Sequence, residues 1–192
     1  MPVVIYVHGF LSSSKARKAV LTSEFISNNN VPVSFESYDF SDDPLEALRE
    51  LEKIVCKHIQ NGESVFLIGS SLGGFLSLCI STKYNIKAVL INPCVNPWDI
   101  IPNIQGSLTN PYTNHKFNVS SSCAYEIKKI FDGLSINQSL LALYVQRGDE
   151  VLNYKIACGL LSDAALIHIE DGGSHTFANY SVCLPEIFRF LQ

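Results

Sequence analysis

The sequence predicts an α/β fold, with a mostly parallel central sheet, helices on both faces and one small insertion. Short apolar runs alternate with longer amphipathic helical patterns along the whole chain, as in open α/β sheets. Several runs are apolar at nearly every position, which is typical of strands buried on both faces of a parallel sheet. One segment, residues 92–122, interrupts the alternation. A length of 192 residues suits one domain, and we expect residues 1–192 to form it.

Six apolar runs are the expected strands. They are Val3–Val7, Val33–Tyr38, Val65–Ile68, Ala88–Ile91, Leu141–Val145 and Ala165–Ile169. Because parallel strands are joined by right-handed crossovers, their carboxyl ends meet at one edge of the sheet. Functional residues are therefore expected in the loops that directly follow the strands.

The clearest helix is predicted over Pro44–Gln60. Asp43 is a suitable N-cap, Pro44 suits the first helical position, and Gly62 follows the end. Apolar residues recur at steps of three and four and form one stripe for burial: Leu45, Leu48, Leu51, Val55 and Ile59. Further helices are expected at Lys15–Ser27, Leu72–Thr82, Ala124–Phe131, Tyr154–Leu161 and near the C-terminus.

The segment 92–122 contains four prolines and several Asn and Ser residues, with little periodicity. A long irregular stretch inside a compact domain is usually functional or a flexible insertion. Because it follows the strand Ala88–Ile91, we expect it to fold over the carboxyl edge of the sheet as a small cap.

Composition excludes several classes of protein. The net charge is −4 and no run of Lys or Arg occurs, so nucleic acids and acidic membrane surfaces are poor partners. No apolar stretch approaches the ~20 residues of a membrane span, and no signal-peptide pattern opens the chain. The six cysteines are scattered without metal-ligand spacing, so we expect a cytoplasmic protein with no metal. Oligomeric state is left open.

A serine in "GSSLG", Gly69–Gly73, has the spacing of an activated nucleophile. The pattern G-x-S-x-G centres on Ser71, because centring it on Ser70 would need glycine at Ile68 and Leu72. The pattern lies between an expected strand and an expected helix, where a sharp turn exposes the hydroxyl. The alternative is a small-residue turn with a serine N-cap.

A histidine must accept the serine proton, and five histidines compete: His8, His58, His115, His168 and His175. We predict His175, because "EDGGSHTF" is a glycine-rich loop directly after the last strand. His58 is expected at a helix surface, His168 as a structural residue within a strand, and His115 in the insertion. An exposed loop residue is the alternative for His175.

A carboxylate should orient the histidine, and "GDEV" after the strand Leu141–Val145 offers Asp149 or Glu150. Asp149 is preferred because it comes first off the strand, and Asp39 is a second choice. The alternative roles for Asp149 are a helix cap or a solvated loop acid. The order Ser71, Asp149, His175 is that of the α/β-hydrolase arrangement, with each residue after a different strand.

Two backbone N–H groups should bind the developing oxyanion. One is that of Leu72, directly after the nucleophile. The other is expected from "YVHGFLSSS" after the first strand, where Gly9 permits the N–H of Phe10 to point into the site, with Leu11 as the alternative donor. His8 is expected to hold this loop by hydrogen bonds.

The motifs "YVHGFLSSSKARKA", "GSSLGG", "NPYT", "GDEVLNY" and "GGSHTF" together resemble the YqiA/YcfP-type family of small bacterial esterases with the α/β-hydrolase fold. The resemblance spans nearly the whole chain in the same order. It implies a compact single-domain hydrolase with a small cap and esterase or thioesterase activity. It also implies Ser71 as nucleophile, Asp149 as acid and His175 as base.

The sequence thus predicts a serine hydrolase that cleaves a small-molecule carboxylic ester or thioester and needs neither a metal nor an organic cofactor. Phe10, Trp98, Tyr112 and Phe177 are expected to line the acyl pocket, with ordinary packing as the alternative. Two other functions stay open. One is an acyltransferase or a hydrolase of another bond with the same residues, and the other is a non-catalytic ligand-binding protein.

Overall fold

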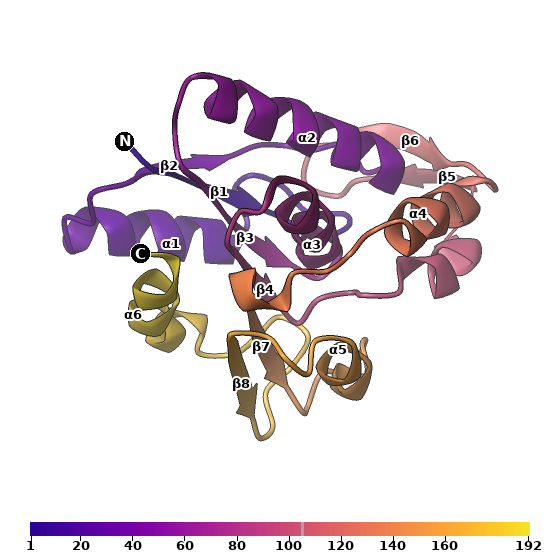
Figure 1. Cartoon of the computed structure of the whole chain (residues 1–192). Helices are drawn as coiled ribbons and strands as arrows, with labels where there is room; N and C mark the ends of the chain where they lie inside the picture. Colours follow the sequence, from indigo (N-terminus) through magenta and orange to yellow (C-terminus); the bar gives the residue numbers. More distant parts are fainter. Residues whose placement is uncertain (105) are drawn as a thin grey trace.

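A computed structural model describes residues 1–104 and 106–192 (Figure 1). Its centre is a six-stranded sheet in which all pairings are parallel, with the order β2-β1-β3-β4-β7-β8. In chain order the elements are β1 (Val3–Val7), α1 (Arg17–Asn28), β2 (Ser34–Ser37), α2 (Pro44–Gln60), β3 (Val65–Ser70), α3 (Leu72–Tyr84), β4 (Ala88–Ile91), η1 (Pro97–Asp99), η2 (Ile101–Ile104), β5 (Gly106–Thr109), β6 (Lys116–Val119), α4 (Cys123–Asp132), η3 (Gln138–Leu140), β7 (Leu141–Gln146), α5 (Tyr154–Leu160), β8 (Leu166–Glu170) and α6 (Tyr180–Leu191).

Helices cover both faces of the sheet, as Figure 1 shows. Along β1, Val4 and Tyr6 pack with residues of α1 and α6 on one face. Val3, Ile5 and Val7 point to the other face, where α2 and α3 lie. All five side chains are at most 1% exposed, which explains why this strand has no polar position. The expected α/β fold with a parallel sheet is therefore confirmed.

The helix α2 begins and ends as its sequence predicts. The Asp43 carboxylate accepts hydrogen bonds from the backbone N–H groups of Leu45 and Glu46, which caps the first turn. Leu48, Leu51 and Val55 of the predicted stripe are buried against the sheet. Ile59, also in the stripe, is 39% exposed, because the last turn of α2 extends beyond the packed region.

The strand order brings the ends of β1 and β3 together. The two strands are neighbours in the sheet, yet the chain leaves β1 toward α1 on one face and β3 toward α3 on the other. In open α/β sheets such a reversal leaves a crevice beyond the carboxyl ends of the two strands. The loop after β1 and the turn after β3 therefore face a common opening.

The segment 92–122 has more regular structure than its sequence predicts. It contains the short 3-10 helices η1 and η2 and the antiparallel hairpin β5–β6, which lies apart from the main sheet (Figure 1). The hairpin strands have four residues each, too short for a clear alternating pattern in a Pro- and Asn-rich segment. Residue 105 lies outside the described residues.

Asn110 fixes the turn of this hairpin. Its buried side-chain amide donates to the Asp42 carboxylate at 2.8 Å and to the backbone oxygen of Ser12 at 2.9 Å. Its side-chain oxygen accepts from the N–H groups of Tyr112 and Thr113, which forms the turn of the "NPYT" motif. Asn110 thus ties the hairpin to the loop after β1.

Among the described residues, no helix is long and apolar enough to cross a membrane.

Candidate active site

Ser71 occupies a strained turn between β3 and α3. Its backbone has φ 55° and ψ −120°, a conformation that residues other than glycine rarely adopt. Its side chain makes no capping hydrogen bond to α3, unlike the serine N-cap that was the alternative. The hydroxyl is therefore free to face the carboxyl edge of the sheet.

The two glycines that flank Ser71 are required by close packing. A Cβ on Gly69 would overlap the backbone oxygen of Gly73, and a Cβ on Gly73 would overlap the backbone oxygen of Val7 in β1. The first turn of α3 is thus pressed against the ends of two strands, a distance that only glycine allows. The G-x-S-x-G spacing is a packing requirement of the turn.

His175 and Asp149 lie beside Ser71 in a chain of hydrogen bonds. The Nε2 of His175 is 3.0 Å from the Oγ of Ser71, although the residues are 104 positions apart. The Nδ1 of His175 is 2.9 Å and 3.0 Å from the two carboxylate oxygens of Asp149, whose side chain is only 2% exposed. Asp149 follows β7 and His175 follows β8, so the three loops converge at the carboxyl edge.

Asp149 and Glu150 contact different parts of His175. The Oδ1 of Asp149 also accepts from the N–H groups of Val151 and Leu152, which orients the carboxylate toward the imidazole ring. Glu150 instead accepts the backbone N–H of His175 at 2.9 Å, and this hydrogen bond lowers the pKa of the Glu150 carboxyl. Of the two acids left open by the sequence, Asp149 contacts the ring.

Two buried amides that are not among the sequence predictions hold the His175 loop. The Nδ2 of Asn92 donates to the backbone oxygens of Ser174 at 3.0 Å and His175 at 3.2 Å. The Oε1 of Gln146 accepts the N–H groups of Ser174 at 3.0 Å and Ala178 at 2.9 Å. Each amide is a polar residue at the end of an apolar strand run, a signal that could have indicated them.

The loop after β1 is held by His8, as predicted. The Nε2 of His8 accepts the backbone N–H of Phe40 at 3.1 Å, so the proton of the neutral ring lies on Nδ1. That Nδ1 lies 2.8 Å from the backbone oxygen of Gly9 and donates to it. His8 is buried and serves the loop that carries Phe10.

Both expected oxyanion donors border the site. Within the described part of the chain, the backbone N–H groups of Phe10 and Leu72 make no hydrogen bond, so both are free for a ligand. Leu11 has a positive φ of 51° and an N–H that is equally free. The assignment of Phe10, with Leu11 as the alternative, therefore stays a prediction.

An apolar cavity of about 240 Å³ opens on Ser71 and His175. Its other lining residues carry no charge, and they include Phe10, Leu72, Ile100, Ile101, Ile104 and Leu152. Several of them come from η1, η2 and the residue between these two turns. Part of the segment 92–122 thus lies at the site.

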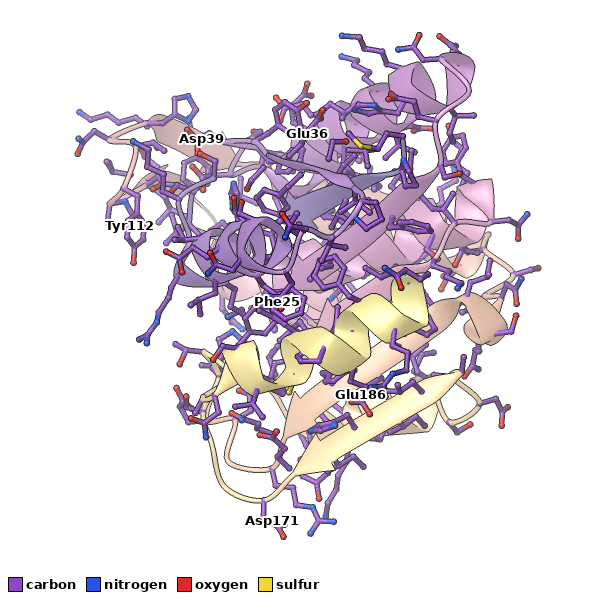
Figure 2. The ribbon with its side chains drawn as sticks, turned by 90° about the vertical axis from the view of Figure 1, so that its left-hand side faces the viewer. Phe25, Glu36, Asp39, Tyr112, Asp171 and Glu186 are labelled. Atoms are coloured by element: carbon purple, nitrogen blue, oxygen red, sulfur yellow. The ribbon has the colours of Figure 1, made fainter. Side chains whose placement is uncertain are left out.

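The four aromatic residues expected in an acyl pocket lie in different places. Phe10 lines the apolar cavity. Trp98 does not line it and packs against Phe131, with 5.1 Å between the ring centroids. Phe177 is 2% exposed and belongs to the core beneath α6. Tyr112 is 70% exposed and projects from the hairpin (Figure 2), where it borders a second hollow beside Ser71.

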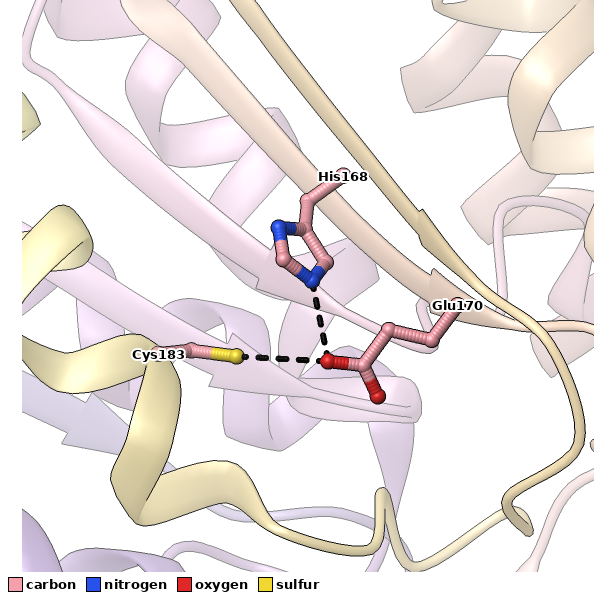
Figure 3. Close-up of side chains that lie close together, drawn as sticks. All are labelled: His168, Glu170 and Cys183. Atoms are coloured by element: carbon pink, nitrogen blue, oxygen red, sulfur yellow. Dashed lines mark hydrogen bonds and ion pairs between the residues drawn. The ribbon is translucent and has the colours of Figure 1, made fainter.

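His168, Glu170 and Cys183 form a second cluster of titratable side chains (Figure 3). His168 bridges Glu170 at 2.9 Å and Glu186 at 3.2 Å, as expected of a structural histidine. Burial raises the pKa of the Cys183 thiol to about 12, and this thiol donates to Glu170. These hydrogen bonds join β8 to α6, which is a structural role for the cluster.

The parallel sheet, its strand order and the sharp turn after β3 define the class as the α/β-hydrolase fold. Solved structures of this fold are similar over the whole chain. Est1E from Butyrivibrio proteoclasticus, solved with ferulic acid, has a TM-score of 0.78 at 14% identity, covering 100% of this chain and 88% of that one. A monoacylglycerol lipase from Paleococcus ferrophilus has a TM-score of 0.69 at 16% identity, covering 98% and 93%.

The chain belongs to the uncharacterised protein family UPF0227, whose sequence model matches residues 3–192. The UPF0227 protein YcfP of Escherichia coli O9:H4 (strain HS) is 25% identical over 189 residues, which is 98% of each chain. A UPF0227 protein of Pectobacterium atrosepticum is 24% identical over the same length. The resemblance drawn from the motifs is thereby confirmed.

Proposed function

We propose that the protein is a serine hydrolase that cleaves a carboxylic ester or thioester through an acyl-enzyme. The observation that carries the proposal is the chain of hydrogen bonds from the Oγ of Ser71 through His175 to the buried Asp149. A serine hydroxyl is a weak nucleophile until a positioned base takes its proton. This geometry supplies such a base and a group that orients it.

In the first half of the reaction, Ser71 attacks the carbonyl carbon of the substrate. Asp149 accepts the Nδ1–H of His175, which leaves Nε2 unprotonated and ready to take the serine proton. The carboxylate then stabilises the imidazolium, and the N–H groups of Phe10 and Leu72 donate to the oxyanion.

In the second half, His175 returns its proton to the leaving alcohol or thiol, and the bond between the carbonyl carbon and that atom breaks. Water then attacks the carbonyl carbon of the acyl-serine while His175 takes its proton, and His175 returns that proton to the Oγ of Ser71 as the bond between the acyl carbon and this oxygen breaks. The released products are a carboxylic acid and the alcohol or thiol. All of these steps use side chains and backbone groups of this chain.

The apolar cavity supports an uncharged hydrocarbon acyl group. An anionic acyl group there would lose its hydration without gaining a partner, because the lining residues include no Lys or Arg. We propose that the segment 92–122 acts as a cap, since η1, η2 and Ile100 between them form part of the cavity wall. All six cysteines are free thiols, which supports the proposed cytoplasmic location.

Labelling with a fluorophosphonate probe, together with a panel of chromogenic esters, tests this function. We expect the wild type to be labelled and to turn over esters, and Ser71→Ala to do neither, since loss of a triad nucleophile can cost ~10⁶ in turnover. Ser70→Ala is the matched control, and this variant should still be labelled. Full activity in Ser71→Ala, or labelling at Ser70, would overturn the mechanism.

A further inference from the structure

A second hollow, of about 230 Å³, also opens on Ser71 and His175. It shares Phe10 and these two residues with the apolar cavity, so both spaces meet at the nucleophile. Polar groups from the loop after β1, the hairpin and the His175 loop line it, including Ser12 and Thr176. The two spaces therefore differ in chemistry although they meet at one serine.

The second hollow adjoins a larger one of about 750 Å³ at the beginning of α1. The two share Ser12, Ala16, Lys18, Tyr112 and Thr176 as common walls. A substrate bound at Ser71 could therefore extend through the second hollow toward the larger one, away from the apolar cavity.

Three cations line the larger hollow, and none of its lining residues is an Asp or Glu. They are Lys15, Arg17 and Lys18, and no carboxylate of the described residues forms an ion pair with them. The carboxylate that lies near Lys15 is Asp39, and its Oδ1 accepts the backbone N–H of Ser14 at 2.6 Å. In a chain of net charge −4, this is a local excess of positive charge.

Lys18 connects these cations to the candidate active site. Its Nζ donates to the backbone oxygen of Thr176 at 2.9 Å, one residue after His175. This contact uses one of its three donors and leaves two for a ligand. Burial lowers the pKa of Lys18 to about 8, so the ammonium form still predominates at neutral pH.

We propose that the leaving alcohol or thiol of the substrate carries an anion, a phosphate or a carboxylate, that binds to Lys15, Arg17 and Lys18. This inference rests on the proposed hydrolase function. The acyl group occupies the apolar cavity, the scissile carbonyl lies at Ser71, and the anion extends to the start of α1. Only the bond between the carbonyl carbon and the oxygen or sulfur of the leaving group breaks. Its leaving atom takes the proton from His175, and the anionic group is released unchanged with the alcohol or thiol.

Matched esters with one acyl group test the proposal. The probes are 1-butyrylglycerol, its 3-phosphate, and the butyryl ester of glycerate, which separates a carboxylate from a phosphate. We expect the wild type to have a kcat/KM about tenfold or more higher for at least one anionic ester than for the neutral one. A glycerol ester of succinate, with the charge on the acyl side, should be a poor substrate.

The double variant Lys15→Gln/Arg17→Gln should lower the ratio of anionic to neutral kcat/KM about tenfold. Lys53→Gln/Lys57→Gln on the exposed side of α2 removes the same charge elsewhere and should keep the wild-type ratio. An equal fall of the anionic-to-neutral ratio in both double variants would mean general electrostatic attraction. An unchanged ratio in both would mean that the hollow binds no anion. Preference for the succinate ester would place the anion on the acyl side. Each of these three outcomes overturns the proposal.

Binding of glycerol 3-phosphate, measured by calorimetry on the Ser71→Ala protein, separates this inference from the proposed function. We expect binding that the Lys15→Gln/Arg17→Gln changes weaken. If the wild type hydrolyses 1-butyrylglycerol but shows neither anion preference nor anion binding, only the leaving-group inference fails. If no ester is hydrolysed and no probe labels Ser71, the hydrolase function itself fails.

Discussion

The side chain of Asn92 links the end of β4 to both β7 and the loop that carries His175. Its Oδ1 accepts the backbone N–H of Gln146 at 2.9 Å, while its Nδ2 donates to the backbone oxygens of Ser174 and His175. Asn92 has a positive φ of 39° and is 2% exposed, so it is fixed in place. The position of the candidate base therefore depends on a residue 83 positions away.

The change Asn92→Asp should lower kcat about 10- to 100-fold with a smaller effect on KM. The substitution keeps the acceptor oxygen but replaces the donor with an oxygen that faces two backbone oxygens, so the His175 loop must shift. A small displacement of a catalytic group costs a large factor in rate. Ester kinetics and circular dichroism would measure it, with the exposed Asn118→Asp as control. Unchanged kcat in a folded Asn92→Asp protein would contradict this role.

Two glycine substitutions should change stability in opposite directions. Gly73→Ala would force a Cβ into the backbone oxygen of Val7, so we expect a loss of about 1–3 kcal/mol or more in the free energy of unfolding. Gly159→Ala lies on the exposed side of α5 with open space around it, and should gain about 0.5–1 kcal/mol. Urea denaturation would measure both. A neutral effect of Gly73→Ala would contradict the close packing of α3 on β1.

The size of the apolar cavity should set the preferred acyl length. Ile100 lines the cavity, and Ile100→Phe would fill part of its ~240 Å³. We expect kcat/KM for the 4-nitrophenyl ester of octanoate to fall about tenfold relative to that of acetate, because the longer chain loses its space. The control Ile130→Phe lies on α4, away from this cavity, and should keep the wild-type ratio. Equal changes for both esters would place the acyl group elsewhere.

The stability contributed by His58 should depend on pH. Burial lowers its pKa, but hydrogen bonds to Glu63 and Glu36 outweigh this and hold the pKa above its ordinary value. Such a group stabilises the fold fully below the pKa of the unfolded chain, ~6.5, and loses this contribution as the pH rises through the folded pKa. His58→Gln should therefore destabilise the protein more at pH 6 than at pH 8.5.

Urea denaturation of wild type and His58→Gln at the two pH values checks this expectation. The control is His115→Gln, an exposed histidine in the connection between β5 and β6. The difference in the free energy of unfolding between wild type and His115→Gln should be the same at both pH values. A His58→Gln effect of equal size at pH 6 and pH 8.5 would mean that the ion pairs with Glu36 and Glu63 do not contribute.

The main sheet and its helices could be predicted because their signals are local. The bounds of β1, β4 and α2 agree with those expected from apolar runs and capping residues. The hairpin β5–β6 was not predicted, since its two strands are short and only partly buried, so they carry little periodicity. The prediction that Ile59 belongs to the buried stripe was wrong, because the spacing of apolar residues does not show where along a helix the packing ends.

In the candidate site, too, the sequence predicted the features that have local signals and missed those that depend on distant contacts. The spacing of Gly69 and Gly73 selected Ser71 over Ser70, and the structure gives the steric reason for both glycines: Gly69 lies against the first turn of α3 and Gly73 against the end of β1. The placement of Trp98 and Phe177 depended on which core each ring enters, and sequence does not give that. Asn92 and Gln146 were missed for a related reason. Each makes its contacts with a loop that only the folded sheet brings near.

By itself, the sequence determined the alternation of strands and helices, the turn at Ser71 and the family to which the chain belongs. These depend on patterns within a few residues or along the whole chain. Only the tertiary structure decided that His175 reaches Ser71, that Asp149 rather than Glu150 contacts its ring, and that an apolar cavity and a second hollow with polar walls meet at one serine. The physical reason is that these contacts join loops far apart in the chain. The order of the parallel strands in the sheet determines how close those loops lie in space.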